Sequence, residues 1–336
     1  MSPAATTTST SSAAAAPVAG GLTAEQVASF WRDGYLVIPD ALSAATVAGL
    51  LAETRALLAG FSLASHPLTR FSTGESGAAH VGDEYFLGSG DQVRFFFEED
   101  AFDGATGALA KPKERAVNKI GHALHALSAP FAALLDPAQN PPGGAAPGAR
   151  DSHPAAVARA LGFRDPRCLQ SMVICKQPEI GGAVPPHQDS TFLYTDPPSA
   201  VGFWYALEDA TAANGCLSFL PGSHRWAPVR QRFVRAAGGG GTEFVDNDGA
   251  RFPPGDEYGE RVAAPAAPEP AYVLGEVSAG SLVLIHGNLL HKSERNLSQK
   301  GRIIYTFHII EGDGPTYDER NWLRPPAGGL TRLFRD

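Results

Sequence analysis

Residues 280–310 read GSLVLIHGNLLHKSERNLSQKGRIIYTFHII and hold the clearest structural pattern of the chain. Two apolar runs, each of strand length, flank a polar segment with the composition of a turn. In the second run, polar and apolar residues alternate: Arg302, Thr306 and His308 fall on one face, and Ile303, Tyr305, Phe307 and Ile309 on the other. Because alternate residues of a strand point to opposite faces, this run predicts a β wall that is polar on one side.

Short apolar runs of the same kind recur upstream. They read LQSMVICKQ, AVGFWYALED, CLSFLPG and AYVLGEV, and each is bounded by Gly, Pro, Asn or Asp. Such a series predicts a β-sandwich or barrel. Together with the 37 glycines and 27 prolines, it indicates a mainly β fold over residues 166–336, with a loop insertion at about 230–270.

The N-terminal part, residues 22–165, has mostly helical patterns. Thr23 and Gln26 form a capping-box pattern before a helix, Tyr35–Ile38 suits a short strand, and Ser43 suits the start of a second helix. The run DQVRFFFEED suits a strand, residues 118–135 have helical periodicity, and residues 136–149 suit a surface loop. We expect flanking helices that support the β part within a single domain, residues 22–336.

Composition limits the class of protein. A net charge of -8, with 43% hydrophobic and 18% charged residues, indicates a globular chain that does not bind nucleic acid. No apolar run is long enough to span a membrane. Three cysteines without metal-ligand spacing are expected to be free buried thiols, which favours a cytoplasmic location.

The two ends of the chain leave location partly open. Residues 1–21 are rich in Ala, Ser and Thr and contain no arginine, so we expect a disordered tail rather than an organellar transit sequence. The last residues, LFRD, are not a peroxisomal signal. The sequence does not indicate the oligomeric state.

The stretch PPHQDS holds a histidine and a carboxylate two residues apart, His187 and Asp189. In a strand both side chains would point to one face, as two ligands of one metal require, while Gln188 would point away. A polar turn would hold the same residues, so the pair alone does not establish a metal site. Two histidines and one carboxylate form the ligand set of non-haem iron(II) oxygenases. His286 and His291 are both candidates for the third ligand, and Arg302 could bind a carboxylate through two hydrogen bonds. The position of His286 inside an apolar run favours a buried core histidine.

Several long blocks resemble the phytanoyl-CoA dioxygenase family of Fe(II)/2-oxoglutarate oxygenases. They include RFFFEE, NKIGHALHAL, GGAVPPHQD, EDATAANGCLSFLPGSH, LVLIHGNLLHKSERNLSQKGR and YTFHIIEG, in the order expected for the family. The resemblance covers nearly all of the chain after the tail. It implies a double-stranded β-helix, the cupin-like jelly roll, and hydroxylation of a small-molecule or acyl substrate, an acyl-CoA included. The implied cosubstrates are 2-oxoglutarate and O2, with ascorbate as a supporting reductant.

The resemblance also assigns roles to residues. It places the iron ligands, and thus the catalytic centre, at His187, Asp189 and His291, and the 2-oxoglutarate site at Arg302, Ser293, Lys119, Met172, Gln188 and Trp204. The spacing after His187 leaves Tyr205 as a rival to Trp204. Since halogenating relatives have a small residue in place of the carboxylate ligand, Asp189 favours hydroxylation.

Plainer interpretations remain for several of these residues. Without the resemblance, Lys119 would be a solvated helix residue and Met172 a core residue. His122 and His125 would share one face of a helix and favour structural roles over zinc binding, and His224 suits a turn. At the level of function, the alternatives are a sensor that binds metal and 2-oxoglutarate without turnover, and a jelly roll with structural zinc.

Overall fold

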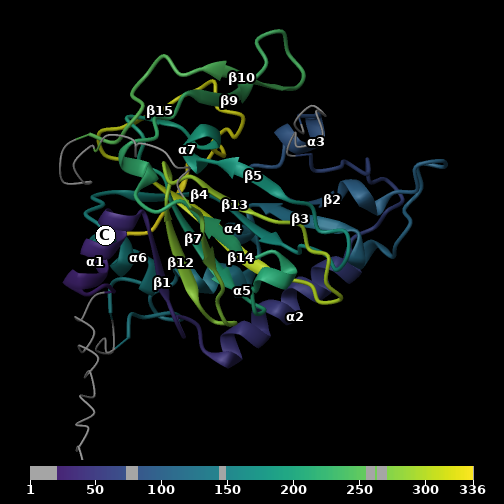
Figure 1. Ribbon diagram of the computed structural model, residues 1–336, viewed down its shortest axis with the longest axis horizontal. Coiled ribbons are helices and arrows are strands. Elements are labelled where there is room, and N and C mark those ends of the chain that lie inside the picture. Colours follow the sequence, from purple (N-terminus) through teal and green to yellow (C-terminus); the bar gives the residue numbers. More distant parts are fainter. Residues whose placement is uncertain (1–20, 73–81, 144–148, 255–261, 263–270, 336) are drawn as a thin grey trace, which may run out of the picture.

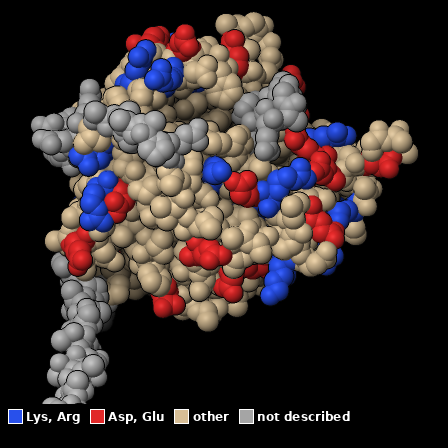
Figure 2. All heavy atoms as spheres, in the orientation of Figure 1, with Lys and Arg blue, Asp and Glu red and all other residues tan. Residues whose placement is uncertain are grey.

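The computed structural model describes residues 21–72, 82–143, 149–254, 262 and 271–335. The expected tail, residues 1–21, lies outside this part of the chain except for Gly21. Figure 1 shows a layered β structure with helices along its lower and left sides. Among the described residues, no helix is both long and apolar enough to cross a membrane. Acidic and basic side chains are interspersed over the face shown in Figure 2.

The N-terminal segment begins as its capping signals predict. Helix α1 spans Ala24–Asp33; the Thr23 hydroxyl accepts a hydrogen bond from the Gln26 amide, and the Gln26 side chain accepts one from the Thr23 amide. Strand β1 follows at Tyr35–Ile38, and helix α2 spans Ala44–Gly60 with Ser43 as its N-cap. These expected elements are confirmed.

The larger sheet has eight strands. Seven of them run in the order β1-β12-β7-β14-β4-β3-β2, all neighbours antiparallel, and the eighth, β16, pairs with β4. The strands are β1 (Tyr35–Ile38), β2 (Val93–Phe97), β3 (Val117–His122), β4 (Pro166–Ile174), β7 (Val201–Ala206), β12 (Leu282–His286), β14 (Ile304–Glu311) and β16 (Thr331–Arg332). Every apolar run predicted as a strand lies in this sheet or in the second one.

The second sheet has the order β11-β8-β13-β5, also antiparallel. Its strands are β5 (Val184–His187), β8 (Leu217–Phe219), β11 (Val273–Gly275) and β13 (His291–Ser293). One buried cluster contains Trp204 and Val283 of the larger sheet together with Leu217 and Phe219 of the second sheet. Two antiparallel sheets packed face to face in this way form the expected jelly roll.

The outer face of the larger sheet is covered by helices. Phe203, Tyr205 and Phe307 share a buried core with Leu50 of α2 and Phe131 of α5. The remaining helices are α3 (Glu84–Leu87), α4 (Leu124–Leu127), α5 (Ala129–Ala132), α6 (His153–Ala160) and α7 (Asp189–Phe192), with short 3-10 helices at Glu99–Ala101, Lys113–Arg115, Ala133–Leu135, Ala212–Asn214 and Ser223–Arg225. The helices thus leave the inner face of the sheet free for a site between the two sheets.

The predicted helix over residues 118–135 is wrong in its first part. Residues 117–122 form β3, between β2 and β4, and the helical turns α4 and α5 begin only at Leu124. Val117, Ile120 and Gly121 are buried, and a Cβ atom on Gly121 would lie 3.1 Å from Met172 Cγ. Sheet pairing and burial therefore override the local helical periodicity.

The predicted loop insertion begins instead as a β-hairpin. Strands β9 (Gln231–Arg235) and β10 (Thr242–Asp246) pair antiparallel, with Phe233 opposite Phe244. The run of four glycines forms the connection, and three of them have positive φ angles between 76° and 102°, which only glycine adopts at little cost. A further two-stranded pair joins β6 (Thr195–Asp196) to β15 (Thr316–Tyr317).

Candidate metal centre and active site

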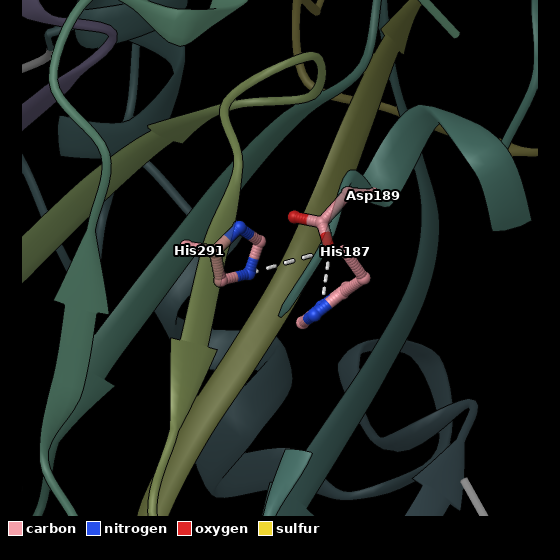
Figure 3. Close-up of side chains that lie close together, drawn as sticks. All are labelled: His187, Asp189 and His291. Atoms are coloured by element: carbon pink, nitrogen blue, oxygen red, sulfur yellow. Dashed lines mark ion pairs between the residues drawn. The ribbon is translucent and has the colours of Figure 1, made fainter. Parts of the chain in front are cut away.

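Three side chains from three elements meet between the sheets. His187 ends β5, Asp189 begins α7 and His291 begins β13, directly opposite His187 in the antiparallel register. Asp189 Oδ1 lies 3.5 Å from His187 Nε2 and 3.7 Å from His291 Nε2 (Figure 3). One potential ligand atom from each residue lies within 4.8 Å of the others, and among the described residues this is the one group with such geometry.

Backbone carbonyl groups fix both imidazole rings. Nδ1 of His187 is 2.9 Å from the Pro185 carbonyl oxygen, and Nδ1 of His291 is 3.0 Å from that of Leu289. Since a carbonyl only accepts, each Nδ1 donates, and each Nε2 keeps its lone pair toward the centre. Burial, with the nearby His187, lowers the pKa of His291 to about 4. The neutral form, which binds metals, therefore predominates at neutral pH.

The two oxygens of the Asp189 carboxylate have different neighbours. Oδ1 faces the histidines, whereas Oδ2 lies 3.1 Å from Nε2 of His308, on β14. Burial alone would raise the pKa of Asp189, but the neighbouring His291 and His308, together with the hydrogen bond that His308 donates, hold it well below its usual range. The carboxylate is thus ionised and oriented. His308 received no role from the sequence, although the alternation along residues 302–310 placed it on the polar face.

The local sequence explains how His187 and Asp189 face the same way. Pro185 and Pro186 cannot donate ladder hydrogen bonds, and β5 ends directly after them. Gln188 is extended, with φ -118° and ψ 130°, before α7 begins. Its side chain points away: Nε2 donates to the carbonyls of Ala227 and Asn288 at 2.9 and 2.7 Å. Gln188 is thus not among the residues that line the cavity, and its expected contact with 2-oxoglutarate stays a prediction.

A cavity of about 450 Å³ lies beside the three side chains. Five of the residues proposed for 2-oxoglutarate line it: Lys119, Met172, Trp204, Ser293 and Arg302. Lys176, which the sequence did not single out, lines it too; its Nζ donates to Ser293 Oγ and to the Gly182 carbonyl, both at 2.9 Å. Three basic side chains, Lys119, Lys176 and Arg302, thus line the cavity together with the buried Glu98.

Arg302 lies in the cavity wall and is only 2% exposed. It lies two residues before β14 rather than inside the strand as predicted. Nη1 donates to the Gly215 carbonyl, Nε has no hydrogen-bond partner among the described residues, and the guanidinium carbon lies 5.4 Å from the Trp204 ring centre. Burial lowers the pKa of Arg302 to about 10, so the side chain stays charged at neutral pH. A buried guanidinium with an unpaired N–H suits an anionic ligand.

Lys119 is a buried strand residue and not a solvated helix residue. It lies on β3, with Nζ 3.1 Å from the centre of the Phe71 ring. Burial lowers the pKa of Lys119 to about 7, although the nearby Glu98 carboxylate opposes this shift. Trp204 lines the cavity, whereas Tyr205 points to the opposite face of β7 and packs in the helix-covered core. The structure thus favours Trp204 over its rival.

The other histidines have structural partners. His286 is buried on β12 beside His224 and Trp31, with ring centres 4.8 and 5.8 Å away, and Nε2 of His224 is 3.0 Å from the Trp31 carbonyl oxygen. Neither lies in the group around Asp189. The preference for His291 over His286 agrees with this placement.

His122 and His125 are not paired on a helix. His122 lies on β3 and its Nδ1 is 2.7 Å from Ser89 Oγ, whereas His125 lies on α4 and its Nδ1 is 2.8 Å from Ser171 Oγ. Each histidine is thus held by a serine. This agrees with the structural roles that the sequence favoured over zinc binding.

The donor set suits iron(II). Two histidines and one aspartate are the facial ligand set of non-haem iron oxygenases, which leaves coordination positions open for other ligands. His187 and His291 come from adjacent strand ends and Asp189 from the first residue of α7, and each presents one potential ligand atom to a common point. Each of the three side chains also makes a hydrogen bond through the atom that faces away from the common point: Nδ1 of each histidine and Oδ2 of Asp189. Such bonds usually orient the ligands of metal sites in proteins.

Comparisons with known proteins agree with this geometry. Among solved structures, the epimerase SnoN in complex with Fe3+, alpha ketoglutarate and nogalamycin RO has a TM-score of 0.54 and 19% identity, with 93% of each chain covered. Apo EctD from S. alaskensis has a TM-score of 0.53 and 21% identity, with 94% of this chain and 89% of that one covered. At these identities the likeness concerns the fold alone, and it places the chain among proteins with the jelly-roll fold.

Sequence relatives are much closer. A sequence model described as phytanoyl-CoA dioxygenase (PhyH) matches residues 30–304. Phytanoyl-CoA dioxygenase domain-containing protein 1 of Bos taurus is 40% identical over 310 residues, which are 90% of this chain and 95% of the relative. Phytanoyl-CoA dioxygenase of Arabidopsis thaliana is 39% identical over 307 residues, 91% and 95%. The chain therefore belongs to the phytanoyl-CoA dioxygenase family, and the prediction of a 2-oxoglutarate-dependent oxygenase is confirmed.

Proposed function

We propose that this protein is an Fe(II)- and 2-oxoglutarate-dependent dioxygenase that hydroxylates a small-molecule or acyl substrate. The proposal rests on one observation: a metal ligand set and buried basic side chains line the same cavity. The His187, Asp189 and His291 ligand set lies at its wall, and the buried cations Lys119 and Arg302 line it as well. A metal ligand set alone would suit many functions, but a cationic pocket beside it suits a dicarboxylic cosubstrate.

Each residue then has a defined task. His187, Asp189 and His291 would hold the iron, which supplies oxidation of a substrate C–H bond by O2, coupled to decarboxylation of 2-oxoglutarate to succinate. Arg302 would bind the distal carboxylate of the cosubstrate through two hydrogen bonds, and Ser293 would donate a third. Because Lys176 already donates to Ser293 Oγ, the serine hydroxyl hydrogen is free for that carboxylate. Lys119 would add a second positive charge, while Met172 and Trp204 would form the walls.

The carboxylate ligand favours hydroxylation over halogenation. Asp189 fills the position that a halide ion would need, and His308 holds its outer oxygen in place. Substitution of the ligand by a small residue would be required to open that position. Ascorbate would serve as a supporting reductant and O2 as the second cosubstrate.

Turnover of 2-oxoglutarate tests the proposal. Purified protein with Fe(II), ascorbate and O2 should convert 2-oxoglutarate to succinate slowly even without substrate, and faster with a productive one. An Asp189→Ala variant is the control, since it removes one iron ligand. If wild-type protein binds Fe(II) and 2-oxoglutarate but forms no more succinate than this variant across a panel of candidate substrates, the protein is a sensor and the proposed activity is refuted.

A further inference from the structure

Beyond the cosubstrate residues, the cavity lining is mainly aromatic. Phe192 of α7, Phe233 of β9 and Phe244 of β10 form one group of rings, with centres 5.1 to 5.9 Å apart. The Phe192 ring lies edge-on to the metal ligand His187, with their centres 6.0 Å apart. This group connects the metal centre to the β9–β10 hairpin, which Figure 1 shows above β5 and β13.

A second group of rings lies near Lys119. Phe86 and Trp322 are stacked with ring centres 4.3 Å apart, and the centre of the Phe71 ring lies 6.3 Å from that of Phe86. The Lys119 ammonium group packs against the Phe71 ring. All three line the same cavity. Aromatic rings in both groups offer flat apolar surface and edge contacts, which suit a substrate with an apolar ring.

Gln170 is a polar residue of the lining for which neither the metal site nor the proposed cosubstrate site has a role. Gln170 is 5% exposed, and its Oε1 makes no hydrogen bond within the described part of the chain. On β4, residues 170, 172 and 174 share a face, and all three line the cavity. Gln170 is also paired with His308 across the β4–β14 ladder, so its side chain lies next to the residue that holds Asp189. A buried amide oxygen without a partner is costly unless a ligand satisfies it.

Two further cations line the cavity within the described part of the chain, and each of them is already in an ion pair. In these partly exposed pairs, Lys292 lies 2.7 Å from Glu294, and Arg295 contacts Asp100. Glu99 adds a further negative charge to the lining, so these five side chains carry a net negative charge. The inner cations, Lys119, Lys176 and Arg302, surround the position proposed for 2-oxoglutarate.

We infer that the substrate is an uncharged molecule with an apolar ring, bound against the Phe192, Phe233 and Phe244 rings with a polar group hydrogen-bonded to the Gln170 amide. The inference rests on the proposed function, because it concerns the second ligand of the same cavity. It assigns Gln170 as a specificity-determining residue. A polyanionic CoA thioester is disfavoured because Lys292 and Arg295 are already paired with carboxylates and Glu99 adds a negative charge.

Three probes with one ring test this inference: benzamide, benzoate and benzoyl-CoA. They are titrated by calorimetry into protein loaded with Mn(II) and 2-oxoglutarate, a form in which binding is measured without turnover. Benzamide should bind most tightly. Its affinity should fall about tenfold in Gln170→Leu, the effect of one lost hydrogen bond to a buried amide, and a Gln139→Leu variant of an exposed loop residue is the matched control.

A second variant covers the case in which Gln170→Leu does not fold. Phe244 is 37% exposed on the hairpin, so Phe244→Ala should fold and should weaken benzamide binding by about threefold to tenfold. The inference is overturned if benzoate or benzoyl-CoA binds more tightly than benzamide, if benzamide does not bind at its solubility limit, or if both variants bind it like the wild type. Loading is recorded separately: failure to bind 2-oxoglutarate refutes the proposed function, whereas normal loading with a preference for benzoyl-CoA refutes only this inference.

Discussion

Replacement of Arg302 by leucine should abolish tight binding of 2-oxoglutarate while sparing the metal. The guanidinium is almost completely buried, its carbon lies 5.4 Å from the Trp204 ring centre, and its Nε–H has no hydrogen-bond partner among the residues that the structure describes. A buried charged pair that loses one partner costs about 2–5 kcal/mol. Loss of about 3 kcal/mol corresponds to an increase of about 100-fold in the Kd of 2-oxoglutarate.

Calorimetric titration of 2-oxoglutarate into Mn(II)-loaded protein measures this Kd. Arg159→Leu is the control, since Arg159 pairs with Asp151 on the exposed side of α6 and is 58% exposed in its side chain. Binding of Mn(II) itself should change little, because Arg302 is not among the ligand residues. A Kd for 2-oxoglutarate in Arg302→Leu that is within about threefold of the wild-type value, a difference below 1 kcal/mol, would refute the role given to Arg302.

Three further perturbations test other parts of the site. In His308→Ala, loss of the hydrogen bond to Asp189 Oδ2 should weaken Fe(II) binding about 10- to 100-fold in a metal titration. His308→Gln, which can still donate a hydrogen bond, should recover part of the Fe(II) affinity. An unchanged Fe(II) affinity in His308→Ala would exclude a role of His308 in holding the aspartate ligand. Burial lowers the pKa of Lys119 to about 7, so the side chain loses its proton as the pH rises above 7. The affinity for 2-oxoglutarate should therefore decrease between pH 7 and pH 9 in wild-type protein but not in Lys119→Met. An equal pH dependence of the affinity in both proteins would contradict this role of Lys119. Gly215 has φ +78°, and a Cβ atom there would lie 2.4 Å from Lys176 Cε. Gly215→Ala should therefore lower the free energy of unfolding, measured by urea denaturation, by at least about 1 kcal/mol. An unchanged free energy of unfolding would show that the loop relaxes freely around the added methyl group.

The sequence predicted most of the β part because its signals are local. The alternation of polar and apolar residues along 302–310 corresponds to the two faces of β14, with Thr306 and His308 toward the cavity and Phe307 toward the core. The caps at Thr23 and Ser43 likewise depend on neighbours within a few residues. Such features do not require knowledge of distant contacts.

Features that depend on distant contacts were predicted poorly. The strand β3 was predicted as helix because its burial between β2 and β4 is not visible in its own sequence. The bonds that Gln188 Nε2 donates to the carbonyl groups of Ala227 and Asn288 could not be predicted either, because these partners lie 39 and 100 residues further along the chain. Lys176 and His308 were missed for the same reason, since their partners Ser293 and Asp189 lie more than a hundred residues away.

The central claim is that His187, Asp189 and His291 hold the iron that turns over 2-oxoglutarate. Its most direct test is a single-turnover experiment in which protein receives one equivalent each of Fe(II) and 2-oxoglutarate without oxygen and is then mixed with O2. We expect close to one succinate per chain from the wild type and almost none from His291→Ala. Equal amounts of succinate from the two proteins would contradict the claim, because the iron would then be held by other residues.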